Sequence, residues 1–206
     1  MNILLHPVYF PNIAHCVAMV HAEEVTFETD DNFQKQTYRN RTYIYDANGK
    51  LILNIPVIHT QKNRQKYRDV KIAKNTKWQV LHWKSLQSAY RTSPFFEFYE
   101  DDLRPLFHLK TNYIMDFNLK CFEVVSECLQ LDLKVNTTET YEHIVEDKTD
   151  LRHLVNAKNE SLFGFDTYTQ VFSEKHGFIG NLSVLDLLFN EGTNALHYLE
   201  SQTLKQ

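Results

Sequence analysis

The chain has 206 residues, of which 43% are hydrophobic, 13% aromatic and 23% charged, and its formal net charge is −4. This length and composition fit a globular protein with a substantial core, and we expect residues 1–206 to form a single domain. The weakly acidic balance gives no overall case for binding nucleic acid. Only five glycines and five prolines are present, which argues against long loops and against a glycine-rich phosphate-binding architecture.

The cysteines and the absence of targeting signals indicate a reducing compartment. Cys16, Cys121 and Cys128 are too few to form a disulfide framework. The first ten residues lack a basic start followed by a long apolar run, and no apolar stretch approaches the roughly 18 residues that cross a bilayer. We therefore expect a cytoplasmic protein with no membrane span. The sequence does not indicate an oligomeric state.

The N-terminal segment predicts the opening of a layered α/β unit. Asn2–Leu5 is typical of a short buried strand, Asn12 can cap a helix over about residues 12–21, and Val25–Glu28 alternates as a second strand. His6 then lies at the C-terminal end of a strand, where open sheets present ligand-binding groups. The alternative is that His6 only closes the strand at the surface.

Three acids follow the second strand. Glu28, Asp30 and Asp31 are interpreted either as solvated loop acids or as groups facing the same cleft as His6.

A hairpin is predicted over about residues 42–58, because Asn48-Gly49 lies between two alternating segments. Pro56, near the end of its second strand, indicates an edge or a bulge there. Arg68–Ala73 alternates as a further strand.

Apolar residues recur with helical spacing in five further segments. We expect these helices over about residues 76–91, 95–104, 112–131, 184–191 and 194–204. Ser183 is the predicted cap of the fourth, with Asp186 returning a bond to that cap. Leu133–Val135 and Tyr168–Phe172 are predicted as short strands. The expected class is α+β, with a small mixed sheet, including the hairpin, packed with helices.

Familiar catalytic and cofactor motifs are missing from the sequence. It contains no Walker A motif, no G-x-G-x-x-G, no G-x-S-x-G and no C-x-x-C. The ten histidines are scattered without zinc-ligand spacing. We therefore predict neither a metal site nor a cofactor. The cysteines are interpreted as small core residues, and a transferase or amidohydrolase that uses Cys16 is the least favoured reading.

The polar group Lys35-x-x-Tyr38-x-Asn40-Arg41 stands at the entrance of the hairpin. If the segment is extended, Tyr38 and Asn40 point to one face, and Arg39 and Arg41 to the other. Arginine and lysine suit a phosphate or carboxylate, so the group is typical of a site for an anionic ligand. The alternative is that Arg41 pairs with an acid and Asn40 caps the turn.

A basic run between Lys62 and Lys77 contains seven basic residues and one acid, Asp69. It has few interleaved aromatic residues, so a solvated face is favoured over a phosphate or nucleic-acid site, and no nucleic-acid partner is expected.

Ordered sequence blocks carry a family resemblance. They are H-P-V-Y-F-P at 6–11, K-x-x-Y-x-N-R at 35–41, N-I-P-V at 54–57, W-x-x-x-H-W at 78–83, A-Y-R-T-S-P-F-F at 89–96, Y-T-Q-x-F at 168–172 and L-S-V-L-D-L-L-F-N-E-G at 182–192. Together they resemble the WbqC-like family. The resemblance implies a bacterial, cytosolic protein in the context of surface polysaccharide or O-antigen synthesis, and it implies no defined reaction.

Polar residues recur in the blocks that carry the resemblance, and this suggests an enzyme or enzyme-like protein acting on an activated sugar, such as a nucleotide sugar, or a related anionic metabolite. His6 or His82 would be the general base, because a neutral imidazole titrates near neutral pH. Lys35 and Arg41 would bind phosphate. The expected substrate-binding residues are Tyr9, Lys35, Tyr38, Asn40, Arg41, Tyr90, Tyr168 and Gln170.

Two features keep other interpretations open. The aromatic segment Phe95-Phe96-x-Phe98-Tyr99 allows a non-catalytic binding or scaffold protein of the cell-envelope pathway, although such rings are more often core. The chain also departs from the family pattern: Pro7 follows His6 directly where a glutamine usually intervenes, and no Tyr-x-Ser-Gly element occurs between Asn136 and Phe165. If that element contributes to a site in relatives, the activity here is reduced or altered.

Overall fold

The computed structural model describes residues 1–60, 64–158 and 163–204. Its α-helices are α1 Ile13–Val20, α2 Trp78–Tyr90, α3 Phe96–Leu103, α4 Ile114–Leu129, α5 Ser173–His176, α6 Val184–Glu191 and α7 Ala195–Ser201. Its strands are β1 Asn2–Leu5, β2 Glu24–Phe27, β3 Arg41–Asp46, β4 Gly49–Asn54, β5 Val57–Ile58, β6 Lys71–Ile72, β7 Lys134–Thr137 and β8 Thr149–Asp150. Its short 3₁₀ helices are η1 Tyr67–Asp69, η2 Arg104–His108, η3 Arg152–Val155 and η4 Gly192–Asn194.

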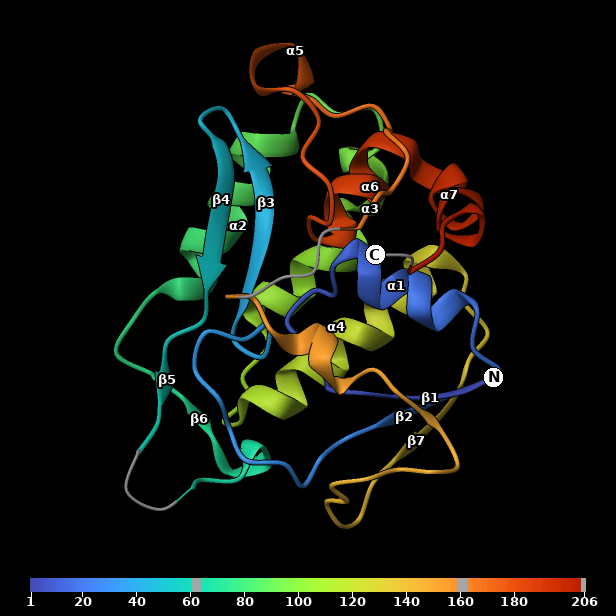
Figure 1. Cartoon of the computed structure of the whole chain (residues 1–206). Coiled ribbons are helices and arrows are strands. Elements are labelled where there is room, and N and C mark those ends of the chain that lie inside the picture. The colour runs from blue at the N-terminus through green and yellow to red at the C-terminus, as the bar shows by residue number, and fades with distance from the viewer. Residues whose placement is uncertain (61–63, 159–162, 205–206) are drawn as a thin grey trace.

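The predicted α+β class is confirmed. A parallel sheet runs in the order β7-β2-β1-β8, and β1, β2 and β7 lie side by side in Figure 1. The antiparallel pairs β3-β4 and β5-β6 form separate small sheets. The chain moves outward from β1 to β2 to β7 and then returns to the other side of β1 at β8. The order therefore reverses beside β1, which in open sheets is the point where ligands bind.

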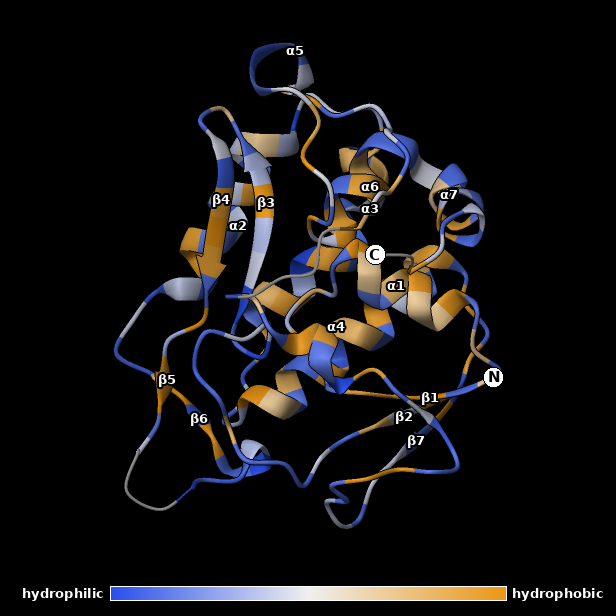
Figure 2. Ribbon diagram, viewed as in Figure 1, coloured by the Kyte–Doolittle hydropathy of each residue, from blue (hydrophilic) through white to orange (hydrophobic). Residues whose placement is uncertain are grey.

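Helices α1 and α4 cover one face of the parallel sheet. Phe27 of β2 meets Phe122 of α4 edge-on with ring centroids 4.8 Å apart, and Met19 of α1 lines the same small gap beneath Leu5 of β1. Much of α1 and α4 is hydrophobic, whereas α5 is hydrophilic along its length (Figure 2). These two helices therefore build the core that fixes the ends of β1 and β2.

The predicted caps of two helices are confirmed. The side chain of Asn12 accepts a hydrogen bond from the backbone N–H of His15, and that of Ser183 accepts one from Leu185. Asp186, which we expected to bond back to the cap, instead turns its carboxylate to side chains of other elements.

The hairpin is confirmed, but its second strand is shorter than predicted. Strand β4 ends at Asn54, and Val57–Ile58 pairs with Lys71–Ile72 instead of continuing the hairpin. Proline has no N–H for a ladder bond, so the chain breaks at Pro56. The carbonyl of Pro56 then accepts from Ala73 and directs the chain toward β6.

Two predicted strands are wrong in extent or type. Within Arg68–Ala73 only Lys71–Ile72 is a strand, because the preceding residues close the 3₁₀ turn η1. Tyr168–Phe172 is not a strand. The side chain of Gln170 both donates to the carbonyl of Ile179 and accepts from its N–H, which replaces ladder pairing there.

Candidate functional site

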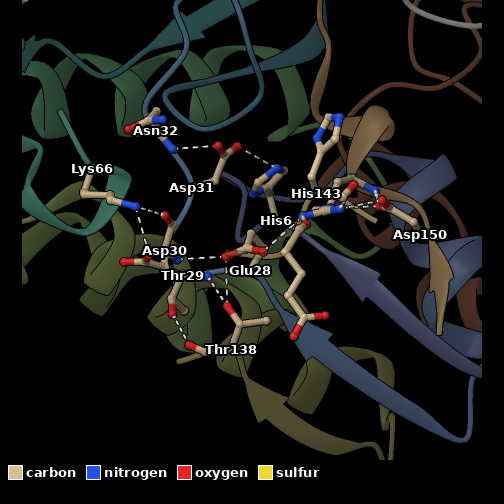
Figure 3. A network of polar contacts seen from close by, with 12 residues as sticks. His6, Glu28, Thr29, Asp30, Asp31, Asn32, Lys66, Thr138, His143 and Asp150 are labelled. Atoms are coloured by element: carbon tan, nitrogen blue, oxygen red, sulfur yellow. Dashed lines mark hydrogen bonds and ion pairs between the residues drawn. The ribbon is translucent and has the colours of Figure 1, made fainter. Parts of the chain in front are cut away.

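The C-terminal edge of the parallel sheet carries a cluster of buried charges. Glu28 directly follows β2, Thr138 follows β7, and Arg152 follows β8. Glu28 is 0% exposed; its carboxylate accepts from the Thr138 hydroxyl at 2.8 Å and from Arg152 Nη1 at 3.2 Å. Figure 3 shows Glu28 and Thr138 in contact within this network. The ends of β2, β7 and β8 are thus tied together by one carboxylate.

Arg152 is held rigidly in this cluster. Its Nε and Nη2 donate to the two oxygens of Asp150 at 2.9 and 2.6 Å, and its Nη1 donates to the carbonyl of Glu142 at 2.8 Å. The hydrogen bonds from Arg152 lower the pKa of Asp150, and the same pairing raises the pKa of Arg152. The two-pronged pairing fixes the guanidinium at the point where β8 meets η3.

His6, at the end of β1, belongs to a second buried group with Arg39 and Asp31. Arg39 Nη2 donates to Asp31 Oδ2 at 2.7 Å and to His6 Nε2 at 2.9 Å, and His6 Nε2 lies 3.3 Å from the same carboxylate oxygen. In Figure 3 His6 and Asp31 point toward each other. Because a guanidinium only donates, Nε2 of His6 carries the lone pair.

His6 is neutral at physiological pH. Burial lowers its pKa well below the usual 6.5, and the positive charges of Arg39 and then Arg152 lower it further. Arg39 is itself positioned by other elements: Asn118 of α4 donates to its carbonyl at 2.6 Å, and its guanidinium lies 5.3 Å from the ring centroid of Tyr67.

A cavity of about 320 Å³ opens over these two groups and is called the sheet-edge cavity. It lies at the reversal of strand order between β1 and β8. Its lining residues are His6, Asp31, Gln34, Arg39, Tyr141, His143, Asp150, Arg152, His153, Val155 and Asn156. Much of its outer wall comes from residues 141–156, within the segment where the chain departs from the family pattern.

A second cavity of about 500 Å³ lies at the mouth of the hairpin and is called the hairpin cavity. Its lining residues are Phe33, Lys35, Gln36, Asn40, Arg41, Asn54, Ile55, Pro56, Val57 and His59. Three of the residues predicted from the sequence, Lys35, Asn40 and Arg41, therefore meet in one place. No carboxylate is among these described lining residues, so the cavity carries uncompensated positive charge.

Several polar atoms of the hairpin cavity are buried without a hydrogen-bond partner in the described part of the chain: Arg41 Nε, Asn40 Oδ1 and His59 Nδ1. The amide nitrogen of Asn40 is used, since it donates to Asn54 Oδ1 at 3.1 Å and to the Ile55 carbonyl at 3.0 Å. Buried polar atoms without partners are rare in folded proteins and mark places where water or a ligand binds.

The expected alternation of side chains before the hairpin is wrong. Asn40 and Arg41 line the same cavity, while Arg39 lines the sheet-edge cavity. Strand β3 begins only at Arg41. The preceding residues bend because the N–H of Tyr38 bonds to Val155 and its carbonyl accepts from Tyr9.

Three other predicted residues meet around a buried carboxylate elsewhere. Asp186 of α6 accepts from the hydroxyl of Tyr90 at 2.7 Å, from the hydroxyl of Tyr168 at 2.6 Å and from Gln170 Nε2 at 2.8 Å. Burial raises the pKa of Asp186, and the three hydrogen bonds oppose that rise. The arrangement joins α2, α6 and the segment before α5.

The remaining predicted residues lie in the core. The hydroxyl of Tyr9 lies 2.9 Å from His82 Nδ1, and both side chains are buried against Trp78. Burial lowers the pKa of His82 to about 4. Tyr38 packs with Val8 and Val155 in a small separate cluster. Neither His82 nor Tyr38 is among the residues that line the sheet-edge or the hairpin cavity.

Some of the charged residues in these clusters were indicated by the sequence, and others were not. Of the three acids after the second strand, Asp31 lines the same cavity as His6, Glu28 is buried against Thr138 and Arg152, and Asp30 pairs with Lys66 at 2.8 Å. In the sequence nothing distinguishes Arg39 from the other basic residues near it. Arg152 lies in a polar stretch without periodicity, so its role was not predicted. Cys16 is fully buried, and burial raises the pKa of its thiol, so it is inert.

Neither a metal-binding cluster nor a membrane-spanning helix is present among the residues that the structure describes. No three His, Cys, Asp or Glu side chains are grouped so that they could hold a metal ion. No helix in that part of the chain is both long and apolar enough to cross a membrane.

Comparison with known proteins places the chain in a family. The model of the WbqC-like protein family matches residues 6–164, which include both cavities. The chain belongs to the WbqC-like family. This WbqC-like protein is 24% identical over 219 residues to the uncharacterized protein Rv1507c of Mycobacterium tuberculosis, and the match covers 93% of this chain and 94% of that protein. None of the solved structures matches significantly.

Proposed function

We propose that this WbqC-like protein is an enzyme or enzyme-like protein that acts on an activated sugar, or a related anionic metabolite, in the cytoplasmic assembly of bacterial surface polysaccharide. One observation supports it above the others: the hairpin cavity brings Lys35 and Arg41 together without a carboxylate among its described lining residues. A diphosphate would neutralise this charge and would supply acceptors for Arg41 Nε, which has no partner among the described residues.

In this proposal Lys35 and Arg41 bind phosphate, and Asn40 orients the ligand through its unpartnered Oδ1. His6 is the general base, because it is neutral and lines the sheet-edge cavity, and its Nε2 becomes free to accept a proton when a ligand takes over the Arg39 N–H that it now accepts. The other predicted residues, Tyr9, Tyr38, His82, Tyr90, Tyr168 and Gln170, act by holding the scaffold.

Removing either cation of the hairpin cavity is expected to weaken anion binding. Lys35→Ala and Arg41→Ala should each raise the dissociation constant for inorganic pyrophosphate and for UDP-glucose by about tenfold or more, since a charge-assisted hydrogen bond contributes about 1.5–3 kcal/mol. Isothermal titration calorimetry at low salt measures this, and added NaCl should reduce the wild-type affinity.

Lys74→Ala is the matched control. Lys74 is exposed and does not line the cavity, so this substitution removes one positive charge elsewhere on the surface. It should bind as the wild type does. Absence of binding by the wild type, or equal losses in all three variants, would refute the assignment of the anion to this cavity.

A second function, a non-catalytic scaffold protein, is favoured by a single observation. Phe98 on α3 is 66% exposed, whereas its neighbours Phe96 and Tyr99 are buried. Phe98→Ser should leave folding intact and abolish capture of a partner from cell extract if this function holds. If the variant captures the partner as the wild type does, the scaffold function through Phe98 is refuted.

A further inference from the structure

The sheet-edge cavity is lined by an arginine with hydrogen-bond donors that nothing in the described chain uses. Arg39 is 0% exposed, and within the described part of the chain only its Nη2 is bonded, to Asp31 and to His6. Its Nε and Nη1 are buried without a partner. An unsatisfied buried donor costs about 1–3 kcal/mol, so a guanidinium left in this state is expected to meet an acceptor that enters the cavity.

Charge decides what kind of acceptor fits. The carboxylates of Glu28, Asp31 and Asp150 surround the guanidiniums of Arg39 and Arg152, and His6 is neutral. Among the lining residues the carboxylates of Asp31 and Asp150 balance the two guanidiniums, and Glu28 behind Arg152 adds a further negative charge, so the site has no excess positive charge to attract an anion. A neutral oxygen, such as a hydroxyl or an ether oxygen, needs no such excess.

The other polar residues that line the cavity can both donate hydrogen bonds to hydroxyl groups and accept hydrogen bonds from them. Gln34 and Asn156 carry amides that both donate and accept, and Asp31 offers carboxylate oxygens as acceptors. Tyr141 is 40% exposed, with its ring 4.9 Å from the Arg152 guanidinium, and it offers a flat apolar surface beside these polar groups. A volume of about 320 Å³ accommodates a small ring.

We propose that the sheet-edge cavity binds an uncharged group with several hydroxyls, such as the ring of a sugar, and that Arg39 donates to one of its oxygens. This deepens the proposed function, on which it rests for the class of ligand. An experiment can refute one proposal without refuting the other, because the phosphate site depends on Arg41 and the sugar site depends on Arg39 and its neighbours.

The test uses unphosphorylated sugars. Glucose, galactose, mannose and N-acetylglucosamine are titrated separately into isotopically labelled full-length protein, and the backbone amide and arginine Nε–H signals are followed by NMR. At least one sugar should shift the Arg39 Nε–H signal and the backbone amide signals of residues within 141–156. The same sugar should leave the Arg41 Nε–H signal unchanged. No response to any of the four sugars, or a response of the same signals to inorganic phosphate, would overturn the proposal.

Variants outside the buried cluster keep the test independent of folding. Gln34 and Asn156 are exposed lining residues, so the double variant Gln34→Ala/Asn156→Ala should fold normally. It should weaken binding of the responding sugar by about tenfold, as expected for two lost hydrogen bonds. Asn75→Ala, at an exposed asparagine outside the cavity, should leave sugar binding unchanged. Equal affinity in the double variant and the wild type would contradict the assignment.

Discussion

Lowering the pH from 7 to 4 is expected to remove about 6 kcal/mol or more of the free energy of unfolding, much of the stability of an ordinary domain. The cause is a set of histidines that fold in the neutral form. Burial lowers the pKa of His15 to about 3 and that of His82 to about 4, and it lowers the pKa of His6 well below 6.5. Below pH 6.5 these histidines bind protons in the unfolded chain but stay neutral in the folded protein.

The direction follows from linkage. A histidine with a depressed folded pKa gives its full stability above pH 6.5 and loses it as the pH falls toward the folded value. Asp150, whose pKa is lowered by Arg152, loses stability in the same direction at more acidic pH. Asp186, whose pKa is raised by burial, works in the opposite direction, but it is one group against three histidines.

Urea unfolding at pH 7, 6, 5 and 4 measures this loss. His82→Gln should flatten the dependence by about 3 kcal/mol over this range, because one proton-linked group is gone. The matched control is His108→Gln, at an exposed histidine, which should keep the wild-type slope. Equal stability at pH 4 and pH 7 would show that these histidines are not buried as described.

Replacing Asp186 by alanine is expected to destabilise the protein by about 3–5 kcal/mol, because it leaves several buried donors without their acceptor at roughly 1–3 kcal/mol each. The change removes the acceptor of Tyr90, Tyr168 and Gln170 together. These donors come from distant segments, so their buried polar groups would be left without a common partner. Chemical unfolding at pH 7 gives the free-energy difference.

Asp186→Asn separates charge from hydrogen bonding. Its amide keeps one acceptor oxygen but turns a donor toward the tyrosine hydroxyls, so the loss should be smaller than for alanine. Asp101→Ala, at an exposed acid of α3, is the control and should change stability by less than about 0.5 kcal/mol. A loss below about 1 kcal/mol for Asp186→Ala would mean that the carboxylate is not the centre of this network.

The sequence predicted those parts of the fold that depend on residues close together in the chain, such as helix caps and tight turns. Asn12 and Ser183 cap their helices, a hairpin forms around Asn48-Gly49, and His6 lies at the end of a parallel strand, each as the sequence indicated. The break after Asn54 was indicated by Pro56, but the pairing of Val57–Ile58 with Lys71–Ile72 depends on a partner outside the hairpin.

The candidate site was predictable only where neighbours in sequence line one cavity. Lys35, Asn40 and Arg41 lie close together in the chain and meet in the hairpin cavity. The sheet-edge cluster depends on partners far apart: Arg39 bonds to a residue 33 positions away, and Glu28 bonds to Arg152 across 124 positions. No local pattern in a single sequence encodes such pairs.

The most direct test of the central claim follows the Nε–H signal of Arg41 by NMR while inorganic pyrophosphate is added at low salt. The signal is assigned by its absence in Arg41→Lys. Because Arg41 Nε has no partner in the described chain, binding in the hairpin cavity should shift this signal strongly and saturably, and it should leave the signal of Arg152, which is bonded to Asp150, in place. An unmoved Arg41 signal at saturating pyrophosphate would contradict the account.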